Sequence, residues 1–281
     1  MLLRPHQWVK NAFVLAPLLL TPDVLSAASL LTVAAGAVAF SAVSSAMYIL
    51  NDYLDRESDR AHPLKRLRPL ASGAVRPAVA LGLHSLLMVA GFGLAVWLSP
   101  AFALLLAVYA LLNAAYSLRL KHLAIVDVFV IALGFVLRVE GGAILAAVES
   151  TVWITIITGL LALFIALAKR RDDLVKSLDN AHRRSLDGYN KPFLDAAVVV
   201  VLGALLVAYL IYTTDAEVMA RMASDRLYYT APFVVAGIMR YLQIIFVEER
   251  SGAPTALVLT DRFLIITILG WMATLGWLLY A

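Results

Sequence analysis

The chain has 281 residues, of which 62% are hydrophobic and only 15% are charged. A soluble domain carries about a quarter charged residues and needs a polar surface, which this composition cannot supply. Soluble, fibrous and disordered proteins are therefore excluded. The chain contains no cysteine, which excludes disulfides, thiol catalysis and cysteine-bound metals. The net charge of +4 is compatible with nucleic-acid binding, but the distribution of the basic residues favours another explanation.

Long apolar stretches predict an all-α, polytopic membrane protein, because a membrane helix needs about 20 apolar residues. Their solidly apolar character disfavours a transmembrane barrel, whose strands alternate. Nine helices are expected in a single domain over residues 1–281. The first stretch is short and contains Pro17, so it is expected to be a half-span or surface helix, and a cleaved signal peptide is less favoured. The stretches lie at about residues 12–20, 27–50, 77–98, 101–117, 123–147, 151–168, 193–213, 228–247 and 263–280.

Lysine and arginine residues concentrate in alternate loops, which sets the expected orientation. The segments 51–76, 119–121 and 169–192 hold most of them, whereas the opposite connections hold only Arg221 and Arg226. Because cytoplasmic loops are enriched in these residues, we predict an N-in, C-out protein of the cytoplasmic (inner) membrane. The basic excess is then largely a topology signal, and no nucleic-acid partner is needed to explain it.

An acidic run, NDYLDRESD at residues 51–59, directly continues the second apolar stretch. On a helix, Asp52, Asp55 and Asp59 would fall within about 60° of one another. Three carboxylates on one stripe repel each other, and a divalent cation removes that repulsion. Oxygen ligands without histidine or cysteine suit Mg²⁺. The alternative is a solvated helix end whose acids pair with the two neighbouring arginines.

A cationic loop, HPLKRLRPLASG at residues 62–73, follows the acidic run. Its two prolines stiffen the backbone beside the carboxylates. Arginine presents planar bidentate donors to phosphate and lysine supplies a point charge, so Lys65, Arg66 and Arg68 are candidate phosphate ligands. Carboxylates with a metal next to such a loop form a constellation suited to a diphosphate.

Two motifs resemble those of the UbiA superfamily of intramembrane prenyltransferases. Asn51-Asp52-x-x-Asp55-x-x-x-Asp59 resembles its first aspartate-rich motif, and Tyr116-Ser117-x-x-Leu120-Lys121 matches its Tyr-Ser-x-x-Leu-Lys element. The resemblance covers essentially the whole chain and is greatest to the decaprenyl-phosphate phosphoribosyltransferase branch. The stretches shared with that branch are LRPHQWVKN at 3–11, HPLKRLR at 62–68, Lys121-His122 with Asp127, GFVLR at 134–138, LAKRR at 167–171 and LDGY at 186–189.

The second cytoplasmic loop departs from the prenyltransferase pattern. Family prenyltransferases usually carry a second Asp-x-x-x-Asp there, but residues 169–176 read KRRDDLVK. One interpretation is that Asp172 and Asp173 pair with lysines on the same helical face. The other is that Lys169 and Arg170 clamp phosphate in place of metal charge, which is the pattern the resemblance implies for the phosphoribosyltransferase branch.

The resemblance implies a helical bundle around a central cavity, Mg²⁺ as cofactor, and transfer of 5-phosphoribosyl from phosphoribosyl pyrophosphate to a polyprenyl phosphate, giving a cell-wall precursor. Arg138, in the middle of a span, either binds phosphate or pairs with an acid. The implied catalytic residues are Asp52, Asp55, Lys65 and Arg66. The implied metal ligands are Asn51, Asp52, Asp55 and Asp59. The implied phosphate ligands are Lys10, Asn11, Lys65, Arg66, Arg68, Tyr116, Lys121, Arg138, Lys169 and Arg170.

Two other functions are compatible with parts of the sequence pattern. A prenyltransferase that acts on an aromatic acceptor would use a metal in the same way to bind diphosphate. The absence of a second Asp-x-x-x-Asp motif disfavours this function. A transporter of anionic lipids or metabolites would favour internal symmetry and broken helices at mid-membrane, and the sequence shows neither. The sequence also leaves open whether the chain forms a homo-oligomer.

Overall fold

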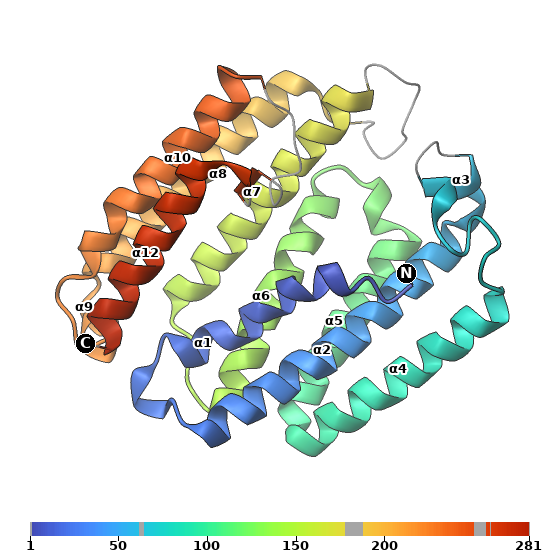
Figure 1. Ribbon diagram of the computed structural model, residues 1–281, viewed down its shortest axis with the longest axis horizontal. Helices are drawn as coiled ribbons and strands as arrows, with labels where there is room; N and C mark the ends of the chain where they lie inside the picture. The colour runs from blue at the N-terminus through green and yellow to red at the C-terminus, as the bar shows by residue number, and fades with distance from the viewer. Residues whose placement is uncertain (1, 62–64, 178–187, 250–256, 259, 281) are drawn as a thin grey trace. The chain divides into compact units, whose positions relative to one another are not determined.

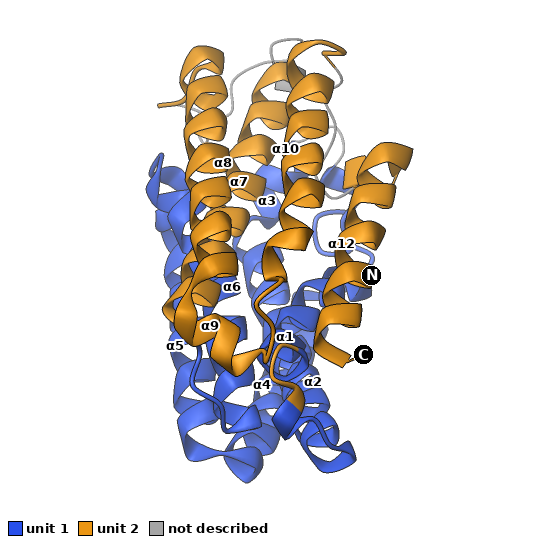
Figure 2. Ribbon diagram, turned by 90° about the vertical axis from the view of Figure 1, so that its left-hand side faces the viewer, with its two compact units in different colours: residues 1–19, 23–150 blue, residues 20–22, 151–281 orange. Residues whose placement is uncertain are grey.

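The protein is all-helical throughout the residues that the computed structural model describes, which are 2–61, 65–177, 188–249, 257–258 and 260–280. The chain divides into two compact units (Figures 1 and 2). Unit 1 comprises Met1–Leu19 and Asp23–Ser150, and unit 2 comprises Leu20–Pro22 and Thr151–Ala281.

Unit 1 is a helical bundle in which the long helix α2 packs along α4 and also contacts α5 and α6 (Figure 1). Short helical segments connect these helices and carry most of the charged residues of interest. Its elements are η1 (Pro5–Leu15), α1 (Ala16–Leu19), α2 (Ala27–Leu54), α3 (Arg56–Arg60), η3 (Lys65–Leu67), α4 (Pro77–Leu98), α5 (Pro100–Leu118), η4 (Leu120–His122) and α6 (Val126–Ala146).

The core of unit 1 lies where α2, α5 and α6 meet. Phe40 and Phe102 are fully buried and pack edge to face with ring centroids 5.7 Å apart. Gly91 of α4 lets α2 come close, because a Cβ there would lie 2.7 Å from the side chain of Val43 and 3.2 Å from the carbonyl oxygen of Ala39. This contact fixes the position of α2, whose C-terminal end carries the acidic run.

The first of the nine apolar stretches is not among the described helices that are long and apolar enough to cross a membrane, as expected for a half-span or surface helix. It is a 3₁₀-helix, η1, followed by the four-residue α1. Prolines at both ends limit its length, since Pro5 starts η1 and Pro22 starts the next short segment. The segment Leu2–Leu19 instead packs against α2 and α6, and we call it the N-terminal arm.

Unit 2 contains four long helices and short connecting segments. Asp215 and Asp261 each precede a helix and accept backbone N–H groups of its first turn, as N-cap residues do. Arg240 donates to Asp261 and Glu248, with N–O distances of 2.7 and 2.6 Å. The elements are α7 (Val152–Ser177), α8 (Lys191–Thr214), α9 (Ala216–Arg221), η6 (Leu227–Thr230), α10 (Ala231–Phe246) and α12 (Arg262–Tyr280).

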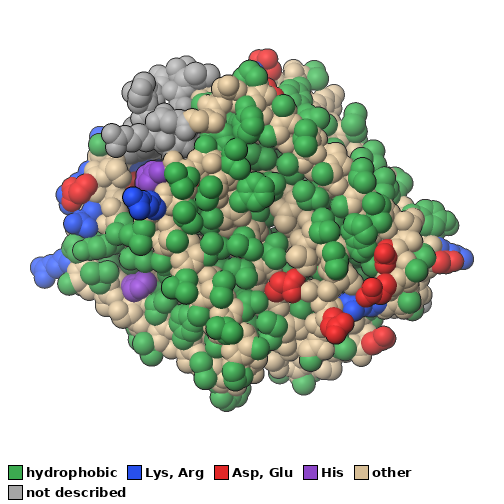
Figure 3. Space-filling model, turned by 180° about the vertical axis from the view of Figure 1, so that it is seen from behind, with side chains coloured by type: hydrophobic (Ala, Val, Ile, Leu, Met, Phe, Trp, Pro, Cys, Tyr) green, Lys and Arg blue, Asp and Glu red, His purple; other side chains and the backbone are tan. Residues whose placement is uncertain are grey.

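Among the described residues, eight helices are long and apolar enough to cross a membrane. They coincide with the second to ninth expected stretches. Large hydrophobic side chains are exposed along them, including Leu31 and Trp97 at 72% and 79%. Figure 3 shows one face on which hydrophobic side chains predominate and charged ones gather in small groups. Such an exterior suits lipid rather than water.

Candidate active site

The acidic run lies at a break between two helices, which separates its carboxylates. Helix α2 ends at Leu54, Asp55 has φ −88° and ψ 0°, and α3 begins at Arg56. The expectation that all three carboxylates share one helical stripe assumed a single continuous helix. Because the backbone leaves the helical path at Asp55, the three aspartates form a buried pair, Asp52 and Asp59, and a separate third member.

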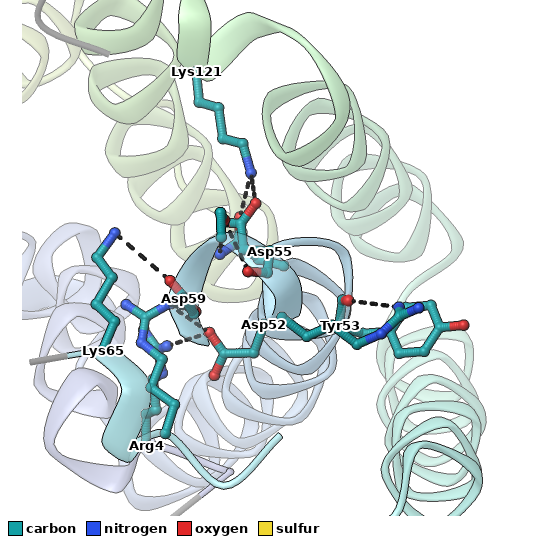
Figure 4. A network of polar contacts seen from close by, with 11 residues as sticks. Arg4, Asp52, Tyr53, Asp55, Asp59, Lys65 and Lys121 are labelled. Atoms are coloured by element: carbon teal, nitrogen blue, oxygen red, sulfur yellow. Dashed lines mark hydrogen bonds and ion pairs between the residues drawn. The ribbon is translucent and has the colours of Figure 1, made fainter. Parts of the chain in front are cut away.

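Asp52 and Asp59 share one guanidinium nitrogen (Figure 4). Nη1 of Arg68 lies 3.0 Å from Oδ1 of Asp52 and 2.7 Å from Oδ2 of Asp59. Nη2 of Arg4 lies 2.5 Å from the same Asp52 oxygen, and Nζ of Lys65 lies 3.9 Å from Asp59. Both carboxylates are only 3% exposed. Buried charges persist only when paired, and here arginines from two distant segments supply the pairing.

Asp55 belongs to a second group formed with Asn51 and Lys121. Nζ of Lys121 donates a hydrogen bond to Oδ1 of Asp55 and lies 3.5 Å from Oδ1 of Asn51. The Asn51 amide donates to the other Asp55 oxygen at 3.1 Å. Lys121 lies in η4, after α5, so the contact joins the Tyr-Ser-x-x-Leu-Lys element to the acidic run (Figure 4).

The residues around Asp52 fit a hard divalent cation by their chemistry. No group of three or more histidine, cysteine, aspartate or glutamate side chains is arranged around a metal position within the described part of the chain. However, two buried carboxylates face one positively charged atom, Nη1 of Arg68. Oxygen-only donors suit Mg²⁺, which typically takes one or two carboxylates together with substrate phosphates. Asp52 and Asp59 would hold such an ion.

The site carries more positive than negative charge. The ion pairs described above join four cationic side chains to three aspartates. Arg56 lies over the ring of Tyr53, with its guanidinium carbon 4.6 Å from the ring centroid. Arg66, in the cationic loop at residues 62–73, is exposed. An excess of fixed cations beside carboxylates is what binding of a phosphate-bearing, metal-complexed anion requires.

Arg138 forms the centre of another buried polar cluster in unit 1. Its guanidinium donates to Oδ1 of Asn11 at 2.8 Å, to the carbonyl of Gly134 at 2.6 Å and to the hydroxyl of Tyr109 at 2.8 Å. Arg138 is 5% exposed and Asn11 is 2% exposed. All three acceptors are neutral, so within the described residues these contacts do not support pairing with an acid.

The other predicted phosphate ligands lie on several elements of the two units. Lys10 in η1 and Tyr116 in α5 are half-buried. In unit 2, Lys169 is exposed and Arg170 lies 3.6 Å from Asp173, so one of the expected acids pairs with an arginine. The side chain of Lys176, expected to pair with Asp172, lies outside the described residues, as do His62 and residues 186–187. The roles of these residues stay predictions.

Two residues that contribute to the site were not singled out from the sequence. Arg4 binds Asp52 across 48 positions of the chain. Ser45 fixes the arm beside Arg4, since its hydroxyl donates to the Leu3 carbonyl and accepts from the Trp8 indole, both at 3.0 Å. Arg4 and Trp8 lie in the stretch shared with the phosphoribosyltransferase branch, which was the available signal. A single arginine near the N-terminus, however, is equally explained by the excess of basic residues on the cytoplasmic side of a membrane protein.

The fold and the site define a multi-pass membrane protein that presents buried carboxylates and a surplus of cations at the end of its bundle. The chain belongs to the UbiA prenyltransferase family, whose family model matches residues 12–267. Membership in this family of transferases favours an enzyme over the transporter considered above.

Relatives with assigned names match this chain over nearly its full length. The chain is 33% identical to the decaprenyl-phosphate phosphoribosyltransferase of Mycolicibacterium smegmatis, over 99% of this chain and 91% of that protein. It is 31% identical to the protein of the same name from Corynebacterium glutamicum, over 96% and 83%. A UbiA homologue from Archaeoglobus fulgidus bound to DMAPP and Mg²⁺ has the same fold, with a TM-score of 0.73, 18% identity and coverage of 99% and 97%.

Proposed function

We propose that this protein transfers a 5-phosphoribosyl group from phosphoribosyl pyrophosphate to a polyprenyl phosphate in the cytoplasmic membrane. The observation that carries this proposal is the cation-rich site of unit 1 in a chain about one-third identical to decaprenyl-phosphate phosphoribosyltransferases. The products would be polyprenylphosphoryl-5-phosphoribose and diphosphate. The site would face the cytoplasm, because the basic loops lie there in the expected orientation.

The residues of unit 1 suit the departure of diphosphate. The C1–O bond to diphosphate breaks, and the anomeric carbon develops oxocarbenium character. The electron pair and negative charge pass to the leaving group, so fixed cations lower the barrier. Arg68 and Lys65 lie at the buried carboxylates, and Lys121 lies at Asp55. These side chains would bind and orient the diphosphate without moving far.

The acceptor needs little activation. A phosphate monoester carries about 1.5 to 2 negative charges at pH 7, so its oxygen attacks the anomeric carbon without a strong general base. Formation of the C1–O–P bond on the face opposite to the leaving group would invert the anomeric centre. This agrees with a site whose polar side chains are mostly cations and their paired carboxylates.

Mg²⁺ would supply charge neutralisation and orientation of the diphosphate when bound. Asp52 and Asp59 would hold it. Asn51 and Asp55 would remain in their hydrogen-bonded group with Lys121 beside the ion. Support comes from the oxygen-only donors and from the fold shared with a Mg²⁺-bound homologue. Chelation with EDTA should then abolish transfer, and added Mg²⁺ should restore it.

The second candidate is prenyl transfer to an aromatic acceptor. It is supported by the family to which the chain belongs and by the fold shared with a DMAPP-bound homologue. It is disfavoured by the sequence KRRDDLVK at residues 169–176, which lacks a second Asp-x-x-x-Asp. The lysine and arginine in this segment suit a donor whose charge is neutralised by side chains as well as by metal.

The proposal is tested by measuring how much ribose label passes from the aqueous phase into the lipid phase. Purified protein in lipid nanodiscs is given Mg²⁺, ribose-labelled phosphoribosyl pyrophosphate and a polyprenyl phosphate. The expected result is label in the lipid phase together with release of diphosphate, and neither when the polyprenyl phosphate is omitted. Absence of lipid-phase label, with turnover of a prenyl diphosphate and an aromatic acid by the same preparation, would overturn it.

A further inference from the structure

The contacts of Arg4 distinguish it from the other cations of the site. Its guanidinium binds Oδ1 of Asp52 at 2.5 Å, and Arg68 binds that same oxygen at 3.0 Å. A carboxylate oxygen has about two lone-pair positions, so both positions of this oxygen are already used. A metal ion that takes Oδ1 of Asp52 must therefore displace one of the two guanidinium groups.

Arg4 contacts fewer carboxylates than Arg68, although its contact with this oxygen is the shorter one. Arg68 bridges two buried carboxylates through a single nitrogen. Arg4 has Asp52 as its one ion-pair partner within the described residues, and its guanidinium carbon lies 5.2 Å from the ring centroid of Tyr48. Even if the metal used the other Asp52 oxygen, its two positive charges would repel a guanidinium on the same carboxylate. Arg4 is thus the cation that can leave.

The backbone keeps Arg4 at the site after its guanidinium is displaced. Arg4 has φ 48° and ψ 59°, a left-handed conformation that costs free energy for a residue with a side chain. Ser45, which is fully buried, holds both sides of this turn through the Leu3 carbonyl and the Trp8 indole. The arm therefore stays in place, and a released guanidinium remains within side-chain reach of Asp52.

We propose that Arg4 is an exchangeable cation of the site, which neutralises Asp52 in the metal-free protein and moves to a phosphate oxygen of the metal-bound diphosphate. This rests on the function proposed above, and it adds an assignment for the N-terminal arm. The arm delivers a phosphate ligand that competes with the metal when no substrate is present. Metal and diphosphate should consequently bind together better than either binds alone.

Direct binding measurements on the full chain in nanodiscs test this assignment. Mn²⁺ binding is followed by electron paramagnetic resonance without substrate, and inorganic diphosphate binding is followed by calorimetry at saturating Mn²⁺. The test variant is Arg4→Asn, because asparagine tolerates the left-handed backbone. The control is Arg76→Asn, at an exposed arginine before α4.

Arg4→Asn should bind Mn²⁺ about tenfold more tightly and diphosphate about tenfold more weakly, the order expected for one charge-assisted hydrogen bond. Arg76→Asn should leave both affinities within about twofold, as expected for a screened surface charge. Unchanged or weaker Mn²⁺ binding by Arg4→Asn would overturn the proposal, because it would make Arg4 a residue that orients Asp52. Unchanged diphosphate binding would overturn it as well.

A second variant keeps the test valid if Arg4→Asn does not fold. Ser45→Ala leaves every charged residue of the site intact and removes the hydroxyl that fixes the arm. It should shift both affinities in the same directions by a smaller factor, and opposite shifts would count against the proposal. None of these measurements needs phosphoribosyl pyrophosphate. Failure of the proposed function would appear as absent label transfer with the binding results unaffected.

Discussion

At the scale of single residues, the site depends on how the charge of Asp52 is shared. One of its oxygens accepts hydrogen bonds from two arginines that lie 48 positions before and 16 positions after it in the chain. The carboxylate is buried, so removing its charge leaves guanidinium groups without their anion in a poorly hydrated place. The same charge is what a divalent cation would require.

Asp52→Asn should reduce transfer at least about 100-fold, the effect typical of removing one electrostatic contributor from an active site. Asparagine preserves the shape of the side chain, so the protein should still reconstitute as a folded monodisperse sample. The matched control is Glu57→Gln in the same acidic run, whose side chain is 67% exposed and pairs with Arg60. Rates of lipid labelling check both variants, and an active Asp52→Asn would remove the proposed metal site.

At the scale of elements, the N-terminal arm is the part of unit 1 that the apolar pattern describes least well. It is apolar enough to resemble a short span, yet it packs beside α6, and its contact with α6 is very close. A Cβ on Gly142 would lie 1.9 Å from the carbonyl oxygen of Val14. The arm position therefore depends on the absence of a side chain at residue 142.

Gly142→Ala should destabilise the protein by about 1 to 3 kcal/mol, because the new methyl group meets backbone atoms that cannot move aside. The arm would shift, so transfer should fall as well. Gly93→Ala in α4 is the control, since nothing lies within 4 Å of a Cβ there. That change should be neutral or stabilise the helix by about 0.5 to 1 kcal/mol. Thermal unfolding in nanodiscs compares the two, and equal melting temperatures would contradict the close packing of the arm.

In unit 2, the start of α12 should make stability depend on pH. The guanidinium of Arg240, which donates to both Asp261 oxygens, lowers the pKa of that carboxyl to about 2. Its pKa in the unfolded chain is about 3.9. Because the folded value is lower, the stabilisation is fully present above about pH 5 and is lost as the pH falls toward about 2.

The difference in melting temperature between wild type and Asp261→Asn isolates this contribution. Asparagine still caps the helix but carries no charge. Wild type should be the more stable of the two at pH 6, and the difference should shrink steadily as the pH is lowered to 2. A difference that stays constant over this range would show that the Asp261 charge does not stabilise α12.

At the scale of the whole molecule, the apolar stretches predicted the all-helical membrane fold and the positions of its eight candidate spans, because lipid imposes long uninterrupted hydrophobic helices. The acidic run and the cationic loop were also identified, since both are local in sequence. The pairing of Arg4 with Asp52 could not be predicted, because it depends on the path of the arm. Nor could the separation of Asp55 from Asp52 and Asp59, which follows from one non-helical residue at the end of α2.

The central claim concerns the group that is transferred, and a competition between donors tests it most directly. Wild-type protein in nanodiscs receives phosphoribosyl pyrophosphate with a polyprenyl phosphate, and prenyl diphosphate with an aromatic acid, in one reaction containing Mg²⁺. Mass spectrometry of the lipid extract identifies the product. The account predicts a polyprenyl phosphate heavier by one phosphoribosyl group, with no prenylated aromatic acid. A prenylated aromatic acid without the phosphoribosyl lipid would contradict it.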